Sequence, residues 1–242
     1  MANTVKITDC VSSVGIINPN LRIFDIVMST ECGTSYNSYI VRGQKCNALI
    51  EVSHAEYLDI YIENLKSEVD LSSIKYIVLN HNEPDHSGAL SELLQIMPNV
   101  TVVVTAAGAV YLKQITNDPN LNIQVVKDGD TIDLGGKTLK FITAPFLHWP
   151  DSMFTWLEED NTLFPCDFFG AHYCEPYVFD YHIKYPEKYE GALKYYYDAI
   201  FGPFRKYVQA GYEKIKDLDI DFICPGHGPV ITKSGQLNNI KE

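Results

Sequence analysis

The chain has 242 residues, of which 46% are apolar and 21% charged, a composition that suits one large globular domain or two small ones. Its 31 acidic and 19 basic side chains give a formal net charge of -12, which repels phosphate backbones and anionic lipid. No apolar run approaches the roughly 20 residues of a membrane helix, and the first residues lack a basic and then apolar leader. We therefore expect a cytoplasmic protein that binds neither nucleic acid nor membranes.

The apolar periodicity predicts strands that are interleaved with helices. In chain order, we expect strands at 38–41 and 47–52, a helix at 54–66, a strand at 74–80, a helix at 88–96, a strand at 100–104, a helix at 106–115, strands at 123–126, 131–134, 138–143, 153–157 and 162–164, helices at 189–201 and 204–217, and a strand at 221–224. This mixture predicts an α+β fold with two packed mixed sheets flanked by helices, in a single domain over residues 1–242.

A cluster of metal-ligand residue types follows the predicted strand 74–80. Residues 81–86 read His-Asn-Glu-Pro-Asp-His, which is the pattern His-x-Glu-x-Asp-His. Because a proline disfavours helix at the residue before it, we expect an extended or turning segment in which residues 81, 83 and 85 project to one side. The alternative is a solvated turn in which these polar residues occur together by chance.

Three further ligand-type residues each follow a predicted hydrophobic strand. His148 comes after 138–143, Asp167 after 162–164 and His227 after 221–224. Ligand sites in α/β folds usually form where strands end. Together with the first cluster, four strand ends deliver imidazole or carboxylate groups, and this layout indicates a binuclear metal site at the rim of the sheets.

At these residues the chain resembles the metallo-β-lactamase superfamily, and within it the diiron domain of the flavodiiron proteins. The superfamily pattern His-x-His-x-Asp-His has Glu for its second His here, as in the flavodiiron variant, and the phrases HWPDSM, CDFFG and CPGHGP also match. The resemblance spans nearly the whole chain and implies a metallo-β-lactamase-like αββα sandwich. It also implies two iron ions bridged by Asp167, one bound by His81, Glu83, His148 and Asp167, and the other by Asp85, His86, Asp167 and His227.

The chemistry of this donor set agrees with iron. Seven ligand side chains with one bridging make four bonds per metal, and three of the seven are carboxylates. Carboxylate and imidazole ligands suit redox iron and oxygen chemistry, whereas closed sulfur-rich sites suit structural zinc. Zinc remains the alternative metal, because its ligand preferences overlap with those of iron.

The resemblance also points to residues around the irons. Trp149 follows His148 and is expected to line the pocket. Tyr197 matches the family's Tyr-Tyr-x-x-Ile stretch and is a candidate hydrogen-bond donor into the pocket, with ordinary core packing as the alternative. His172 matches a family phrase and is either a proton donor near the irons or a rim histidine that titrates freely.

Flavodiiron proteins normally continue into a flavodoxin-like domain that binds FMN and supplies electrons. No phosphate-binding loop of that type occurs in this sequence, so we expect a single diiron domain without FMN and without a flavodoxin or rubredoxin part. Our leading hypothesis is a non-haem diiron protein that binds O2 at a diferrous site as an oxygen sensor or a chemotaxis-type signalling module. The alternatives are an O2 or NO reductase that takes electrons from a separate flavoprotein or rubredoxin, and a zinc-dependent metallo-hydrolase. The resemblance further implies a homodimer.

Overall fold

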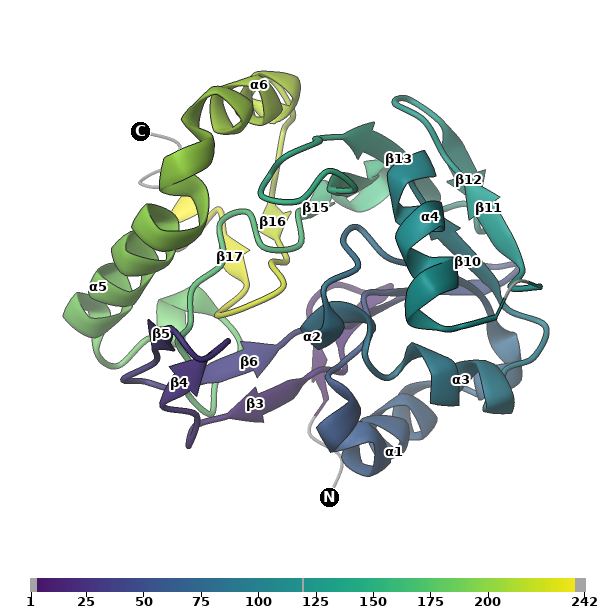
Figure 1. Ribbon diagram of the computed structural model, residues 1–242, viewed down its shortest axis with the longest axis horizontal. Coiled ribbons are helices and arrows are strands. Elements are labelled where there is room, and N and C mark those ends of the chain that lie inside the picture. Colours follow the sequence, from purple (N-terminus) through teal and green to yellow (C-terminus); the bar gives the residue numbers. More distant parts are fainter. Residues whose placement is uncertain (1–3, 119, 238–242) are drawn as a thin grey trace.

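The computed structural model describes residues 4–118 and 120–237 and shows two β-sheets stacked on one another with helices outside them (Figure 1). The larger sheet has seven strands and the smaller one six. Apolar side chains from both sheets form one core between them, and two further cores lie between the sheets and the outer helices. The αββα sandwich expected from the sequence is therefore confirmed.

The seven-stranded sheet joins an antiparallel half to a parallel half. Its strands are, in spatial order, β1 (Val5–Lys6), β2 (Val11–Ser13), β7 (Tyr39–Arg42), β8 (Asn47–Ile50), β9 (Ile74–Val78), β10 (Thr101–Val104) and β11 (Ile123–Val125). Pairing is antiparallel from β1 to β8 and parallel from β8 to β11. Parallel neighbours need crossover connections, which here contain α1 (Leu58–Glu68), α3 (Leu90–Ile96) and α4 (Ala106–Ile115).

The six-stranded sheet has the spatial order β12 (Thr131–Asp133), β13 (Thr138–Thr143), β14 (Met153–Leu157), β15 (Thr162–Phe164), β16 (Phe222–Ile223) and β17 (Ile231–Thr232). The β15–β16 pair is parallel, and its long connection contains α5 (Pro186–Tyr196) and α6 (Arg205–Ile215). Two small antiparallel pairs complete the fold, β3 (Ile16–Asn18) with β6 (Thr34–Tyr36) and β4 (Ile23–Phe24) with β5 (Met28–Ser29).

Successive residues of the central strands point into different cores. On β7, Tyr39 and Val41 join the core between the sheets, whereas Ile40 packs into the core under α1, α3 and α4. Strands that are buried on both faces read as continuous apolar runs, which is why the sequence predicts them clearly.

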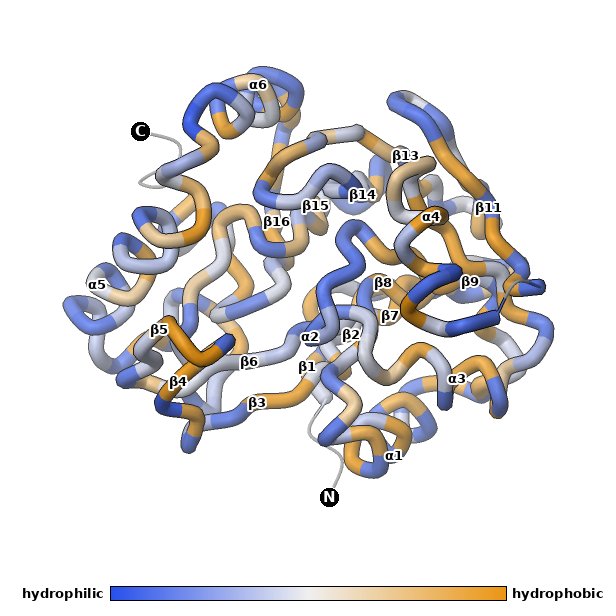
Figure 2. Tube along the Cα trace, in the orientation of Figure 1, coloured by the Kyte–Doolittle hydropathy of each residue, from blue (hydrophilic) through white to orange (hydrophobic). Residues whose placement is uncertain are grey.

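The helices cover a core with one face only, and α1 and α5 alternate between hydrophilic and hydrophobic residues in Figure 2. No helix in the described residues is long and apolar enough to cross a membrane.

The predicted elements lie close to where the periodicity places them. Helix α4 spans the predicted residues 106–115, and it begins where the Thr105 hydroxyl accepts a hydrogen bond from the Gly108 N–H at 3.1 Å. The predicted helix 189–201 is α5 followed by a π-helical turn at Tyr197–Phe201. The periodicity does not predict β1 to β6 or β17, because strands of two or three residues are too short to show an alternating pattern.

The segment after β9 differs from the expected extended chain. Glu83 is extended, but α2 (Pro84–Ser87) then makes one helical turn. Proline is favoured at the first position of a helix, so Pro84 starts this turn and does not prolong the strand. As a result, His81, Glu83 and Asp85 do not all project to one side. Asp85 lies in a different ligand group from His81 and Glu83.

Candidate metal centre

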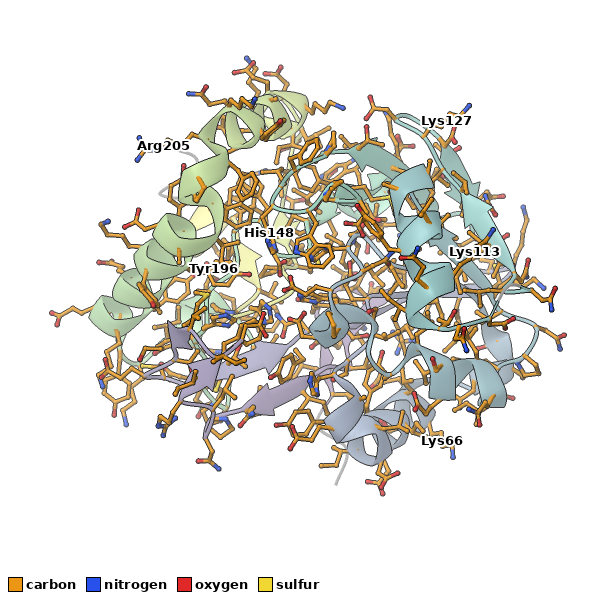
Figure 3. The ribbon with its side chains drawn as sticks, viewed as in Figure 1. Lys66, Lys113, Lys127, His148, Tyr196 and Arg205 are labelled. Carbon is orange, nitrogen blue, oxygen red and sulfur yellow. The ribbon has the colours of Figure 1, made fainter. Side chains whose placement is uncertain are left out.

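Loops at one rim of the sandwich bring together all seven side chains expected to bind metal. His148 lies near the middle of the molecule in Figure 3. The seven side chains are between 1% and 16% exposed. The chain delivers them from four places: His81, Glu83, Asp85 and His86 after β9, His148 after β13, Asp167 after β15, and His227 after β16.

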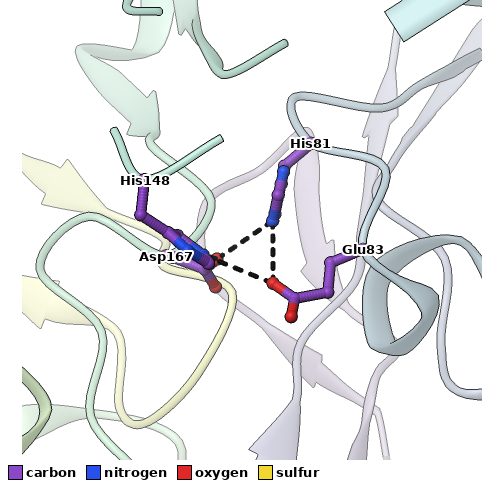
Figure 4. Close-up of side chains that lie close together, drawn as sticks. All are labelled: His81, Glu83, His148 and Asp167. Carbon is purple, nitrogen blue, oxygen red and sulfur yellow. Dashed lines mark hydrogen bonds and ion pairs between the residues drawn. The ribbon is translucent and has the colours of Figure 1, made fainter. Parts of the chain in front are cut away.

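The first ligand group consists of His81, Glu83, His148 and Asp167 (Figure 4). Oε2 of Glu83 lies 3.0 Å from Nε2 of His81 and 3.3 Å from Nε2 of His148. Oδ2 of Asp167 lies 3.0 Å from Nε2 of His148 and 3.5 Å from Nε2 of His81. Two imidazole nitrogens and two carboxylate oxygens therefore face one point.

The second ligand group consists of Asp85, His86 and His227. Oδ2 of Asp85 lies 3.1 Å from Nε2 of His86 and 3.0 Å from Nε2 of His227. Asp167 also reaches this group, because its Oδ1 lies 2.9 Å from Nε2 of His86. One oxygen of Asp167 thus faces each group, which is the arrangement that a bridging carboxylate requires.

Several polar atoms at the centre are buried without a hydrogen-bond partner. Oδ1 of Asp85 has no partner, and Oδ2 of Asp85, Oδ1 of Asp167 and Nε2 of His86 lie close to one another or to His227 without hydrogen-bond geometry. Buried polar atoms in folded proteins are normally satisfied by a hydrogen bond, a water or an ion. The residues therefore fit a pair of metal cations, and the mixed imidazole and carboxylate donors suit iron, with zinc as the alternative.

The contacts within the cluster keep its carboxylates ionised. Burial opposes the protonation of His81, but Asp151 and Glu83 raise its pKa to about 10. Burial likewise opposes the ionisation of Glu83, yet the neighbouring imidazoles lower its pKa to about 2. Burial opposes the charge on Asp167 as well, and His86 holds the pKa of that carboxyl well below its usual range. The centre therefore attracts cations, and bound metal ions would take the place of ring protons.

Two of the ligand histidines contact a polar atom through their other ring nitrogen. Nδ1 of His81 lies 3.5 Å from Oδ1 of Asp151. Nδ1 of His227 lies 2.5 Å from the backbone oxygen of Ser35. Such partners fix the orientation of a metal-binding imidazole and leave Nε2 free for the metal.

Glu51, His86 and Cys166 form a further buried cluster beside the second ligand group. Their ligand-type atoms lie within 4.8 Å of one another. Oε1 of Glu51 accepts a backbone hydrogen bond at 3.0 Å, whereas Oε2 has no partner.

The loop that carries His227 approaches the His86 ring closely at Gly226. A Cβ on Gly226 would lie 2.7 Å from Cε1 of His86, so this position requires glycine.

Trp149 and His172, both singled out from the sequence, lie beside the centre. The Trp149 ring is centred 5.3 Å from that of His81. The His172 ring is centred 4.8 Å from that of His227, and its Nδ1 is 2.9 Å from the Thr34 hydroxyl. His172 is 4% exposed, and burial lowers its pKa to about 3. It is therefore a buried neutral histidine and not a rim histidine that titrates freely.

Tyr196 lies beside the centre, whereas the role expected for its neighbour Tyr197 stays a prediction. The Tyr196 ring is centred 4.9 Å from that of His172 and 6.0 Å from that of His227. Burial raises the pKa of Tyr196 well above its usual value, and the nearby carboxylates act in the same direction. Tyr197 begins the π-helical turn, is only half-buried and has its ring near Phe201.

The sequence patterns did not predict several residues that surround the ligands. Phe24, on β4, has its ring centred 4.2 Å from that of His172 and 5.6 Å from that of His227. Asp151 belongs to the segment HWPDSM, which the sequence analysis matched to the flavodiiron family without assigning a role to this aspartate. Glu51 directly follows the apolar strand β8. The ligand residues were singled out from the sequence because they also follow apolar strands.

Comparisons with known proteins decide the family. A sequence model described as the ODP family β-lactamase matches residues 34–228. The chain is also 54% identical over 239 residues to the flavo-diiron protein FprA2 of Clostridium acetobutylicum, a match that covers 98% of this chain and 60% of the relative. This chain belongs to the ODP family, the metallo-β-lactamase-like diiron domain of flavodiiron proteins.

Solved structures agree with the architecture of this flavodiiron domain. Rubredoxin oxygen:oxidoreductase from Desulfovibrio gigas superposes with a TM-score of 0.94 at 30% identity, covering 98% of this chain and 59% of that one. A flavoprotein from Thermotoga maritima superposes with a TM-score of 0.91 at 32% identity, with the same coverage. The metallo-β-lactamase-like fold is therefore confirmed, and the chain spans about 60% of the length of these relatives.

Proposed function

We propose that this flavodiiron domain is the metal-binding part of an O2 or NO reductase that receives electrons from a flavoprotein or a rubredoxin. The observation that carries the proposal is the pair of ligand groups that share Asp167, built from four imidazoles and three carboxylates. A structural relative supports it, because its name identifies it as an oxidoreductase acting on rubredoxin and oxygen.

Each of the two ligand groups would hold one metal ion. His81, Glu83 and His148 would hold one iron, Asp85, His86 and His227 the other, and Asp167 both. A pair of ferrous ions supplies redox chemistry and binding positions for a diatomic ligand. Trp149 and Phe24 pack against the rings of the ligand histidines, and the raised pKa of Tyr196 keeps its phenol neutral, so that it can donate a hydrogen bond toward the centre.

The electron balance requires an outside donor. Reduction of O2 to two waters consumes four electrons and four protons, whereas coupling of two NO molecules to N2O and water consumes two of each. Two ferrous ions supply only two electrons, so repeated reduction of either gas depends on a donor that re-reduces the irons. Glu83 and His148, with side chains 16% and 13% exposed, are the ligands nearest to solvent and mark the side on which a donor would act.

The oxygen-sensor hypothesis has less support than the reductase. The relatives include a protein named for oxygen reduction, and none of the relatives described here is named as a sensor. A sensor would bind one O2 and keep it, whereas a reductase consumes the gas as long as electrons are supplied.

The test compares two metal forms of the same chain. The protein is loaded anaerobically with iron or with zinc, and O2 and NO consumption is followed with reduced rubredoxin or reduced flavodoxin as the donor. We expect sustained consumption by the iron form and none by the zinc form. A fully iron-loaded protein that consumes neither gas with either donor would contradict the proposal.

A further inference from the structure

A cleft of about 550 Å³ lies between α5 and the segment that contains β5. Ser29 and Cys32 line one wall, and Lys188 and Gly191 of α5 line the other. Figure 1 shows α5 and the β4–β5 hairpin side by side at this edge of the molecule. An exposed ion pair joins the two walls, with 3.3 Å between Nζ of Lys188 and Oε1 of Glu31, and Cys32 packs against an apolar cluster that includes Tyr189 of α5. Exposed ion pairs of this kind contribute little stability.

The floor of the cleft reaches the second ligand group. His172 and Tyr196 line the cleft, and both rings pack against the ring of His227. Nε2 of His172 is buried and forms no hydrogen bond, although its Nδ1 is held by Thr34. The cleft therefore ends at two buried side chains that pack directly against a metal-ligand histidine.

Gly191 leaves the middle of the cleft open. A Cβ at this position would meet no atom within 4 Å, so nothing in the described residues requires glycine for lack of space. A glycine inside a helix costs about 1 kcal/mol relative to alanine. The absence of a side chain at this point of α5 is thus unfavourable for the helix, but it leaves the wall of the cleft open at Gly191.

The cleft and the exposed ligands lie at different ends of the centre. Glu83 and His148 belong to the first ligand group and have side chains 16% and 13% exposed, whereas His227 belongs to the second group and is 2% exposed. A donor protein that acts at Glu83 and His148 would cover that side of the centre. A gas would then need another way in, and the cleft leads to His172 and Tyr196, whose rings pack against that of His227.

We propose that the cleft between α5 and β5 is the access route by which the diatomic substrate reaches the His227 end of the centre, with Gly191 keeping it open. This inference rests on the proposed function, because it assumes that O2 or NO is the substrate. It assigns separate sides of the domain to the gas and to the electrons.

The test measures how fast NO binds to the anaerobically reduced, iron-loaded protein by stopped-flow absorbance. Gly191→Phe places a ring in the cleft and is expected to lower the bimolecular binding rate constant about tenfold. Ser29→Phe, which fills the cleft from the opposite wall, is expected to act in the same direction. Glu190→Phe is the matched control, because Glu190 is exposed on α5 and does not line the cleft. Gly191→Ala is a second control that adds only a methyl group.

A second measurement, which needs no metal, complements the NO-binding rates. Crystals of the iron-free chain under xenon pressure should hold xenon in the cleft, and Gly191→Phe crystals should not. The proposal is overturned if both cleft variants, at parental iron content, bind NO at the parental rate, or if xenon does not enter the parental cleft. A protein that binds NO through the cleft but reduces neither gas with any donor would instead count against the proposed function alone.

Discussion

Asp151→Asn should weaken the metal position that contains His81. Oδ1 of Asp151 lies 3.5 Å from Nδ1 of His81, and both side chains are 1% exposed. The other oxygen, Oδ2, accepts a hydrogen bond from the Asn82 N–H at 3.0 Å. Asparagine has the same shape and can keep that backbone hydrogen bond, so the substitution removes mainly the carboxylate charge that faces the imidazole.

The expected size of this effect follows from the geometry. Removing the outer partner of a metal-binding histidine typically costs 10–100-fold in metal affinity, which is about 1.4–2.8 kcal/mol. A separation of 3.5 Å is longer than a good hydrogen bond, so we expect the lower end, about tenfold. Glu51→Gln should have a similar effect on the other metal position, because Glu51 lies beside His86.

The assay is an anaerobic competition between the protein and a ferrous chelator. In Asp151→Asn, one of the two iron positions should lose affinity while the other stays at the parental value. Asp180→Asn is the matched control, because Asp180 is also a buried carboxylate but binds Thr232 and Gln236 and contacts no ligand. It should lower the melting temperature without changing iron affinity. Equal iron affinity in the parent, Asp151→Asn and Asp180→Asn would refute this reasoning.

Three other predictions test separate parts of the account. Tyr196→Phe should retain iron but lower the turnover number about tenfold, whereas Tyr181→Phe, at a residue that is 51% exposed and does not line the cleft, should leave turnover unchanged in the same steady-state assay. Removing metal with a chelator should lower the melting temperature, and adding Fe²⁺ should restore it in proportion to the logarithm of its concentration. Burial opposes ionisation of Asp160, but hydrogen bonds from Cys10 and Lys137 hold its pKa below the ordinary 3.8. Asp160→Asn should therefore lose about 1 kcal/mol of unfolding free energy at neutral pH, and the parent's advantage should vanish in acid denaturation as the pH falls through the lowered pKa.

The sequence predicted the buried framework of the fold better than its edges. Residues 138–143 and 153–157 are apolar runs that pair with each other in the six-stranded sheet. In such runs the same apolar residues indicate both burial and strand formation. The ligand residues could be found because His148, Asp167 and His227 each follow such a run. The strands near residues 5–36 were missed, since each has only two or three residues and shows no alternating pattern.

The surroundings of the centre were harder to predict from sequence. Three consecutive tyrosines on a helix differ by about 100° in direction, and the π-helical turn at Tyr197–Phe201 changes the direction of the residues that follow. The sequence therefore did not mark Tyr196, whose ring packs against those of His172 and His227. Glu51 and Asp151 were not distinguished from surface carboxylates, because a sequence does not show that their partners are buried imidazoles.

The number of gas molecules consumed per chain distinguishes a reductase from a protein that only binds the gas. The iron-loaded protein is mixed with excess reduced rubredoxin, and the total O2 or NO consumed is counted until the donor is exhausted. We expect many molecules per chain, in proportion to the donor supplied. Consumption that stops near one molecule per chain while reduced donor remains would contradict a reductase and favour a protein that only binds the gas.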